Sequence, residues 1–166
     1  MKVFIIAAVT ADGFIARDSD HMADWTEKED KQLYVKLTKE SGVMVMGSRT
    51  FDTIGRPLPG RKTVVYTQDP EKYQGVDIET TAKPPAELIA QLESEGHSSI
   101  AICGGTKIYT LFMQAGLITD LYLTFAPVVF GTGIQLFQEP LDITLQLESV
   151  EKLGQHSIAA HYSVVD

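Results

Sequence analysis

A chain of 166 residues with 44% hydrophobic and 22% charged residues predicts one soluble globular domain, residues 1–166, with a sizeable core. Its formal net charge is −8, and an acidic chain is a poor partner for nucleic acid or for an anionic membrane surface. The single cysteine, Cys103, excludes an intrachain disulfide and favours a cytoplasmic protein. No apolar stretch is long enough to span a membrane.

The first part of the chain predicts two buried strands joined through a helix. Val3–Val9 is an unbroken apolar run, as in a strand that is buried on both faces. A polar loop follows and ends at Trp25, the only tryptophan, which is either a loop anchor or a core residue. Thr26 is the expected N-cap of a helix that runs to about Lys39, because acidic residues fill its first turn. Val43–Met46 is the second buried strand.

The rest of the chain continues the alternation of strands and helices and closes with a hairpin. Further strands are expected at Thr63–Tyr66, Val76–Glu79, Ser99–Ile102 and Asp120–Ala126, and helices from Pro84-Pro85 through Leu92 and over Thr106–Ala115. Leu141–Glu151 and His156–Val164 indicate an antiparallel hairpin around Gly154. This order predicts a three-layer α/β/α domain whose mixed, mostly parallel sheet carries helices on both faces. Ligands in such sheets bind outside the carboxyl ends of the strands.

A long stretch between two of these strands, Met46–Lys62, has the residues of an anion site. Gly47 ends a strand, and Ser48 or its neighbour can cap a short helix. The free N–H groups of a first helical turn favour a phosphate, and Arg56 and Arg61 add two charged forks. A plain strand–helix–strand connection with solvated arginines accounts for the same residues about as well.

A second glycine turn follows the strand at Ser99–Ile102. Gly104-Gly105 let the backbone approach a ligand closely, the next helix N-terminus can take a pyrophosphate, and Lys107 adds positive charge. Paired glycines alone often mark only a turn. Two strand–glycine–helix units in one chain favour a dinucleotide.

These two segments resemble the dihydrofolate reductase family. Residues 46–61 match its Met-Gly-x-x-Thr-(Phe/Trp)-x-x-Ile-Gly-Arg-Pro-Leu-Pro-Gly-Arg segment, and Gly104–Tyr109 matches its Gly-Gly-x-x-x-Tyr turn. The resemblance implies the fold of that family, NADPH as cofactor, and a cis peptide between Gly104 and Gly105. Ser48 stands where the family often has a basic residue, so the preference for NADPH over NADH stays open. The implied cofactor-binding residues are Ala8, Ile15, Gly47, Ser48, Arg49, Thr50, Thr67, Gln68, Cys103, Gly104, Gly105, Thr106, Lys107, Ile108 and Tyr109.

The same resemblance implies that Asp30 is the catalytic carboxylate, with Trp25 and Thr124 beside it. Asp30 follows Trp25 at the family's spacing for the carboxylate that binds the pterin and promotes its protonation, and Thr124 matches the threonine that hydrogen-bonds this group. In an apolar pocket such a carboxylate has a raised pKa. From the residues alone, Asp30 could equally be a helix-start acid in water, which is the role we expect for Glu27 and Glu29.

The pocket is expected to hold a small-molecule pterin or pyrimidine. The implied substrate-binding residues are Ala8, Phe14, Tyr34, Ile54, Arg56 and Arg61. Among these, Arg61 would pair with the glutamate tail of a folate. The four histidines show no metal-ligand spacing, so no metal site is expected.

Two other segments resemble the pyrimidine reductase of riboflavin biosynthesis, which has the same fold. Thr10–Ala16 is similar to its Asp-Gly-x-Ile-Ala segment, and Pro127–Phe137 to its Gly-x-Gly-x-x-Leu-Phe ending. Lys31 also stands where many folate enzymes present an apolar side chain to substrate. Three hypotheses therefore stay open: NADPH-dependent reduction of 7,8-dihydrofolate, reduction of a ribosylamino-pyrimidinone 5'-phosphate, and noncatalytic NADPH binding. The riboflavin-pathway relatives are commonly dimers and folate reductases commonly monomers, so either a monomer or a homodimer is possible.

Overall fold

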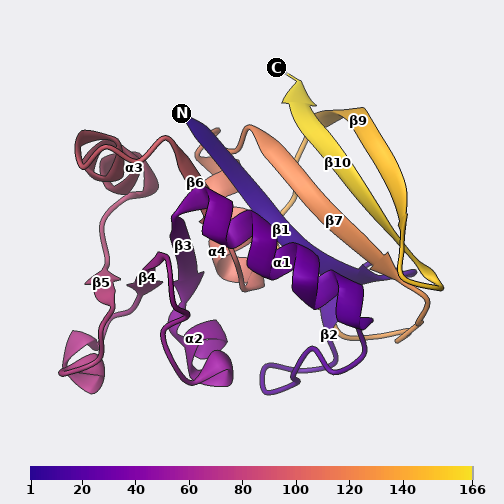
Figure 1. Ribbon diagram of the computed structural model, residues 1–166, viewed down its shortest axis with the longest axis horizontal. Helices are drawn as coiled ribbons and strands as arrows, with labels where there is room; N and C mark the ends of the chain where they lie inside the picture. The colour runs from indigo at the N-terminus through magenta and orange to yellow at the C-terminus, as the bar shows by residue number, and fades with distance from the viewer. Residues whose placement is uncertain (166) are drawn as a thin grey trace.

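An eight-stranded sheet runs through the middle of the molecule in the computed structural model, which describes residues 1–165 (Figure 1). Its strand order is β5-β4-β3-β6-β1-β7-β10-β9. The strands are β1 Lys2–Thr10, β3 Val43–Gly47, β4 Lys62–Tyr66, β5 Glu79–Thr81, β6 Ser99–Ile102, β7 Asp120–Ala126, β9 Thr144–Leu153 and β10 Ser157–Val165. All neighbours from β5 to β7 are parallel, and β10 runs antiparallel to both β7 and β9. The mixed sheet with a closing hairpin is confirmed.

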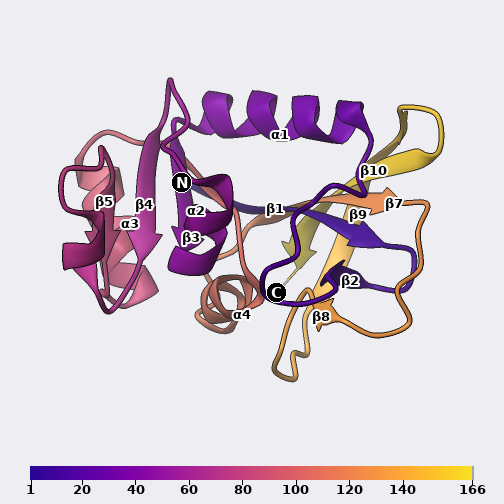
Figure 2. The same ribbon diagram turned by 90° about the horizontal axis from the view of Figure 1, so that it is seen from below.

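Helices cover both faces of this sheet and complete the three layers (Figure 2). Helices α1 (Lys28–Ser41) and α2 (Ser48–Ile54) lie on one face, and α3 (Pro85–Ser94) and α4 (Thr106–Gln114) lie on the other. Alternate side chains of β1 supply the two cores, because successive residues of a strand point to opposite faces. Phe4 and Ile6 pack toward α1 and α2, whereas Ile5 packs toward α3 and α4.

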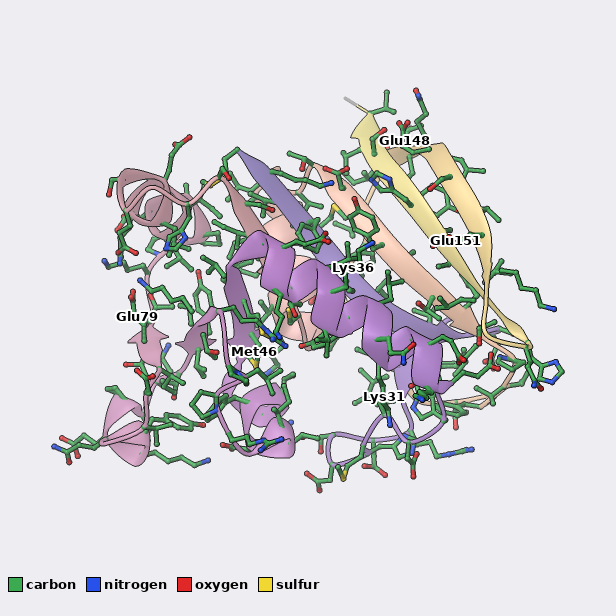
Figure 3. The ribbon with its side chains drawn as sticks, in the orientation of Figure 1. Lys31, Lys36, Met46, Glu79, Glu148 and Glu151 are labelled. Atoms are coloured by element: carbon green, nitrogen blue, oxygen red, sulfur yellow. The ribbon has the colours of Figure 1, made fainter. Side chains whose placement is uncertain are left out.

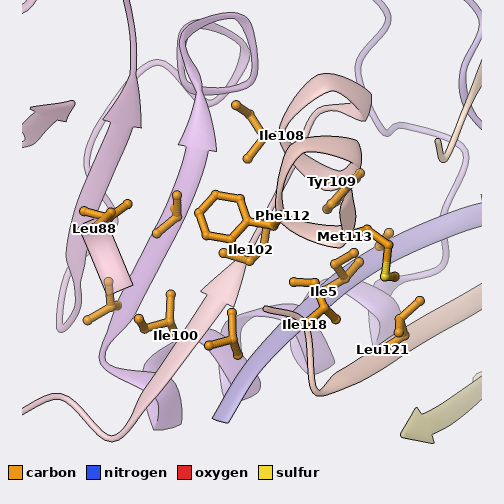
Figure 4. Packing of buried hydrophobic residues seen from close by; sticks show 14 of the residues in the cluster. Ile5, Leu88, Ile100, Ile102, Ile108, Tyr109, Phe112, Met113, Ile118 and Leu121 are labelled. Carbon is orange, nitrogen blue, oxygen red and sulfur yellow. The ribbon is translucent and has the colours of Figure 1, made fainter. Parts of the chain in front are cut away.

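Phe112 of α4 lies at the centre of the larger core (Figure 4). It is fully buried and is packed with Leu88 of α3 and with Ile102 and Ile108. Truncating a buried phenylalanine of this kind to alanine costs about 3–5 kcal/mol. This core holds α4 against the sheet and so fixes the place of its first turn.

The ends of α1 agree only in part with the expected capping. Gly42 takes a left-handed conformation with φ 77° and its N–H bonds the carbonyls of Thr38 and Lys39, so the helix ends as its glycine predicts. The N-cap, however, is Glu27 and makes no side-chain capping bond. The prediction of Thr26 as N-cap is wrong, because the helix begins one residue later.

Three other local predictions differ from the structure. The strand expected at Val76–Glu79 instead begins at Glu79, since a 3₁₀ turn, Pro70–Tyr73, buries Tyr73 against Phe51 and leaves Val76 exposed. The hairpin begins at Thr144 rather than Leu141, and Leu141 packs on the core from the preceding loop. A second, two-stranded sheet of β2 (Phe14–Ala16) and β8 (Ile134–Gln135) was not anticipated, because both strands are too short to show a periodic pattern.

Candidate active site

The two predicted glycine turns meet at the carboxyl ends of β3 and β6. The amide nitrogen of Gly47 donates a 2.8 Å hydrogen bond to the carbonyl oxygen of Gly104. A Cβ atom at Gly47 would stand 3.2 Å from Cγ1 of Ile108, which is closer than side-chain atoms normally pack. The absence of a side chain at Gly47 therefore lets the start of α4 lie against the end of β3.

The Gly104–Gly105 peptide bond is cis, as the resemblance implied. Gly104 has φ 115°, and a Cβ there would stand 3.2 Å from the hydroxyl oxygen of Tyr109 and 3.6 Å from Oγ1 of Thr50. At Gly105 a Cβ would stand 3.5 Å from the same Thr50 oxygen. A side chain at either glycine would fill the space between the first turns of α2 and α4.

This arrangement fits the pyrophosphate of a dinucleotide. The Gly104-Gly105 backbone is bare enough for close approach, and α4 begins directly after it at Thr106. The hydroxyl oxygen of Thr106 is buried and has no hydrogen-bond partner among residues 1–165. Arg49 and Lys107, on the first turns of α2 and α4, are both exposed and supply positive charge beside the two glycine turns.

The other predicted cofactor residues follow the strand ends on either side. Ser48 is the first residue of α2, and Cys103 is buried directly after β6. Thr67 follows β4, where its hydroxyl accepts a 3.0 Å hydrogen bond from the Asp69 N–H, and Gln68 beside it is exposed. Ala8 lies on β1 of the main sheet, and Ile15 lies on β2 of the two-stranded sheet.

Asp30 lies in the first turn of α1 and is partly buried. Burial raises the pKa of its carboxyl above the ordinary value. The hydroxyls of Thr124 and Thr26 and the charge of Lys31 act in the opposite direction. Thr124 is itself buried on β7, in register with Ala8 of β1. The structure therefore brings the predicted acid and its predicted threonine together.

Tyr109 lies beside the glycine turn and is bonded to β1. Its hydroxyl donates a 2.8 Å hydrogen bond to the carbonyl oxygen of Ile6, and it lies beside Gly104. Burial raises the pKa of Tyr109 well above its ordinary value, and the nearby Cys103 and Asp30 raise it further. The charge of Asp30 therefore acts on a side chain that borders the glycine turn.

Tyr34, Cys103 and Arg61 face one another on the α1 side of the sheet. Burial raises the pKa of the Tyr34 phenol well above its usual range, the Cys103 thiol raises it further, and Arg61 lowers it. Arg61 is partly buried and donates to the sulfur of Met44 at 3.2 Å and to the carbonyl of Pro59 at 3.0 Å. Neither contact neutralises the charge of Arg61, so its guanidinium can still bind an anion.

The remaining predicted substrate residues divide into two groups. Phe14 on β2 and Ile54 at the end of α2 are partly buried, as pocket walls should be. Arg56 is exposed in the loop after α2, and no contact brings it to Asp30. Lys31 is also exposed, on the outer surface of α1, and not at a buried pocket wall (Figure 3).

Trp25 anchors the polar loop onto another loop. Its ring packs edge-on against Phe130 at 5.4 Å, and its indole nitrogen is buried without a hydrogen-bond partner among residues 1–165. The Arg17 guanidinium lies 4.1 Å from the centre of the Phe130 ring, and the His21 ring lies 5.7 Å from it. Phe130 was missed in the sequence, where it carries no signal beyond being apolar.

Glu27 is the second residue that sequence reasoning missed. Its carboxylate accepts hydrogen bonds from the N–H of Gln155 at 2.9 Å, the N–H of His156 at 3.2 Å and the hydroxyl of Ser157 at 2.5 Å. These contacts lower its pKa to about 2, with Ser157 as the largest cause. The expectation that Glu27 is simply a solvated helix-start acid is wrong, because the hairpin turn supplies it with donors.

Two absences apply to the part of the chain that the structure describes, residues 1–165. There, no three His, Cys, Asp or Glu side chains gather closely enough to hold a metal ion. None of the helices in the same range combines the length and apolar character that crossing a membrane requires.

The mixed sheet, with helices on both faces and a closing hairpin, defines the dihydrofolate reductase-like class of α/β folds. A family model described as dihydrofolate reductase matches residues 2–146, and the chain belongs to this family. It is 32% identical over 124 residues to the dihydrofolate reductase of Bacillus subtilis (strain 168), covering 74% of this chain and 67% of that one. It is 28% identical over 170 residues to the B. subtilis protein YwjB, covering 97% of each. Family membership indicates an oxidoreductase.

Solved structures with this fold come from both branches that the sequence resembles. A pyrimidine reductase-like protein from Corynebacterium diphtheriae superposes with a TM-score of 0.85 at 17% identity, covering 99% of this chain and 92% of that chain. The dihydrofolate reductase of Enterococcus faecalis, complexed with NADP(H) and RAB-propyl, superposes with a TM-score of 0.74 at 22% identity, covering 99% and 97%. At these identities the likeness establishes the fold.

Proposed function

We propose that the protein reduces 7,8-dihydrofolate to 5,6,7,8-tetrahydrofolate with NADPH, a reaction of cytoplasmic one-carbon metabolism. One observation carries the proposal. Asp30, a partly buried acid with a raised pKa, lies beside Thr124 and near enough to Tyr109 to raise the pKa of its phenol, and the Tyr109 hydroxyl lies beside Gly104. An acid next to a dinucleotide turn is what transfer of a hydride and a proton to one ring requires.

The glycine turns are the proposed cofactor site. Gly47, Gly104 and Gly105 would admit the pyrophosphate, with the Thr50 and Thr106 hydroxyls beside it. Exposed Arg49 and Lys107 would attract the extra phosphate of NADPH, and Thr67 and Gln68 would lie near the adenosine ribose. When bound, the cofactor supplies the hydride that reduces the pterin. The E. faecalis relative, complexed with NADP(H), supports this choice.

Asp30 would bind the pterin and promote its protonation. Its carboxylate can accept two N–H bonds from the amidine-like edge of the ring. Because burial raises its pKa, Asp30 keeps a proton to a higher pH than an exposed aspartate does, which suits a group that promotes protonation. Thr124 would orient the carboxylate. Phe14, Tyr34 and Ile54 would wall the ring, and Arg61 would bind the glutamate tail.

A second candidate is the riboflavin-pathway reaction on a ribosylamino-pyrimidinone 5'-phosphate, and one contact favours it. The Asp12 carboxylate accepts hydrogen bonds from the N–H of Gly131 at 2.7 Å and of Phe130 at 3.2 Å. A Cβ at Gly133 would stand 2.4 Å from the carbonyl oxygen of Ala16. The two segments that resemble the pyrimidine reductase therefore lie against each other.

The deciding experiment follows NADPH absorbance with dihydrofolate and, separately, with the pyrimidinone phosphate. Oxidation of NADPH with dihydrofolate alone supports the first proposal, and oxidation with the phosphate alone replaces it with the second. The variant Asp30→Asn tests the role of the carboxyl: it should lose turnover while keeping NADPH affinity. If NADPH binds but neither substrate is reduced, the protein is a noncatalytic NADPH-binding protein and both reductase proposals are wrong.

A further inference from the structure

The turn of the C-terminal hairpin and the first turn of α1 are joined through one side chain. The Glu27 carboxylate receives the N–H groups of Gln155 and His156 and the hydroxyl of Ser157, which is itself buried. These donors lie 128 to 130 residues further along the chain. The contact is the link by which the β9–β10 turn holds the N-terminus of α1.

The same residue is bonded directly to the proposed catalytic acid. The amide nitrogen of Asp30 donates a 3.1 Å hydrogen bond to the backbone carbonyl of Glu27. Glu27 therefore contacts the hairpin with its side chain and Asp30 with its main chain. A shift of the Glu27 backbone must move Asp30 with it.

The turn packs tightly enough to make this link specific. Gly154 has φ 65°, and a Cβ there would stand 3.0 Å from Oε1 of Glu27 and 2.8 Å from Oε2 of Glu29. The backbone of the turn thus lies directly against the first turn of α1. Among the acidic side chains of this region, Glu27 accepts three hydrogen bonds across the contact and Asp30 faces Thr124 on β7 instead.

We infer that Glu27 is a positioning residue for the reaction: it fixes the first turn of α1 to the β9–β10 turn and thereby sets the orientation of the Asp30 carboxyl beside Thr124. The inference rests on the proposed function for its kinetic consequence, but not for its structural one. If the link loosens, Asp30 becomes more exposed, and it binds its proton less tightly. A displacement of about 1 Å in a catalytic group can lower a rate by roughly a hundredfold.

Three variants distinguish the effect of the Glu27 hydrogen bonds from the effect of its negative charge. Glu27→Gln removes the charge and weakens the acceptor for all three donors. Ser157→Ala removes one donor and leaves the charge in place. Glu29→Gln is the matched control, because it removes a neighbouring charge from the same turn and leaves every hydrogen bond of Glu27 intact.

The first measurement is the titration midpoint of Asp30 by carboxyl-carbon NMR, which needs no turnover. The second is kcat and KM for dihydrofolate at saturating NADPH, with NADPH affinity from fluorescence as a check on the cofactor site. We expect Glu27→Gln and Ser157→Ala to lower the Asp30 midpoint further than Glu29→Gln does. We also expect Glu27→Gln to lower kcat by roughly tenfold or more without weakening NADPH binding.

Midpoints and kcat values in Glu27→Gln and Ser157→Ala that match the Glu29→Gln control would overturn the inference. If circular dichroism shows that Glu27→Gln does not fold, Ser157→Ala decides on the same readouts. If the wild-type protein reduces neither substrate, the proposed function fails, and the NMR midpoints alone decide whether Glu27 positions Asp30.

Discussion

The amide nitrogen of Gly47 donates a 2.8 Å hydrogen bond to the carbonyl oxygen of Gly104. This bond joins the ends of two neighbouring parallel strands, β3 and β6, at the point where each passes into a helix. Both turns are built from glycine, so backbone packs on backbone and leaves room for a ligand. The proposed cofactor site depends on this approach.

Gly47→Ala should weaken NADPH binding. The new methyl group would stand 3.2 Å from Cγ1 of Ile108 and would push the first turn of α4 away from β3. Overpacking of this kind typically costs about 1–3 kcal/mol of stability, and the displaced turn should raise the NADPH dissociation constant. Fluorescence titration measures the affinity and thermal melting the stability. Thr53→Ala, at an exposed position of α2, is the control and should leave the melting temperature nearly unchanged; equal NADPH affinity in both variants would contradict the prediction.

Asp30→Asn should be more stable than the wild type at pH 8. Because burial raises the pKa of Asp30 above its ordinary value of 3.8, the folded protein binds this proton more tightly than the unfolded chain does. The resulting stability is complete below the ordinary pKa and is lost as the pH rises through the folded pKa. Asparagine carries no charge to bury, so its advantage should grow from pH 4 to pH 8. Urea unfolding at both pH values measures it, and a constant difference would mean that Asp30 is not desolvated.

Thr124→Val should move the titration of Asp30 to higher pH. The Thr124 hydroxyl favours the charged carboxylate and lowers the pKa that burial raises. Valine has nearly the same shape but no hydroxyl, so the pKa should rise further. Either carboxyl-carbon NMR or the pH profile of kcat/KM reports the midpoint. Thr119→Val offers a control, because Thr119 directly precedes β7, at the end of that strand opposite to Thr124, and its hydroxyl is bonded to Asp120.

The layers and the paired glycine turns were predictable because each is encoded locally. The apolar run of β1 fills the core on both faces of the sheet, and the glycines at 47 and 104 occupy positions where a Cβ would stand unusually close to a neighbouring side chain. The pairing of Asp30 with Thr124 was implied by resemblance, and the structure brings them together.

The contacts that were missed join residues far apart in the sequence. Glu27 follows Thr26 like any acid at a helix start, and nothing near it shows that its donors come from residues 155–157. Phe130 pairs with Trp25 in the same way, across two loops. The shift of β5 has a related cause, since a 3₁₀ turn buries Tyr73 against a helix that precedes it in the chain. A local periodic pattern in the sequence does not identify contact partners that lie far away in the chain.

The contact between Glu27 and the hairpin should also be visible as acid sensitivity. Hydrogen bonds from Ser157 and two backbone N–H groups lower the pKa of Glu27 to about 2, against an ordinary value of 4.5. A lowered pKa adds stability above the ordinary value, and that stability disappears as the pH falls toward 2. Glu27→Gln should therefore be less stable than the wild type at pH 6, and the two should converge by pH 2. Urea unfolding across this range measures the difference, and a gap that persists at pH 2 would count against the assigned hydrogen bonds.

Arg61→Ala distinguishes the two candidate substrates. Arg61 is partly buried, its two hydrogen bonds go to the Met44 sulfur and the Pro59 carbonyl, and neither partner carries a charge. If the substrate is dihydrofolate, its glutamate tail should pair with this guanidinium, and the variant should raise KM by roughly tenfold to a hundredfold, the value of a charged hydrogen bond, with kcat little changed. Arg56→Ala removes an exposed arginine of the same turn and serves as the control.

Steady-state kinetics with dihydrofolate and with its tail-less pterin analogue make the comparison direct, because the analogue should respond equally to both variants. An unchanged KM for dihydrofolate in Arg61→Ala would remove the folate tail from the site and favour the pyrimidinone phosphate.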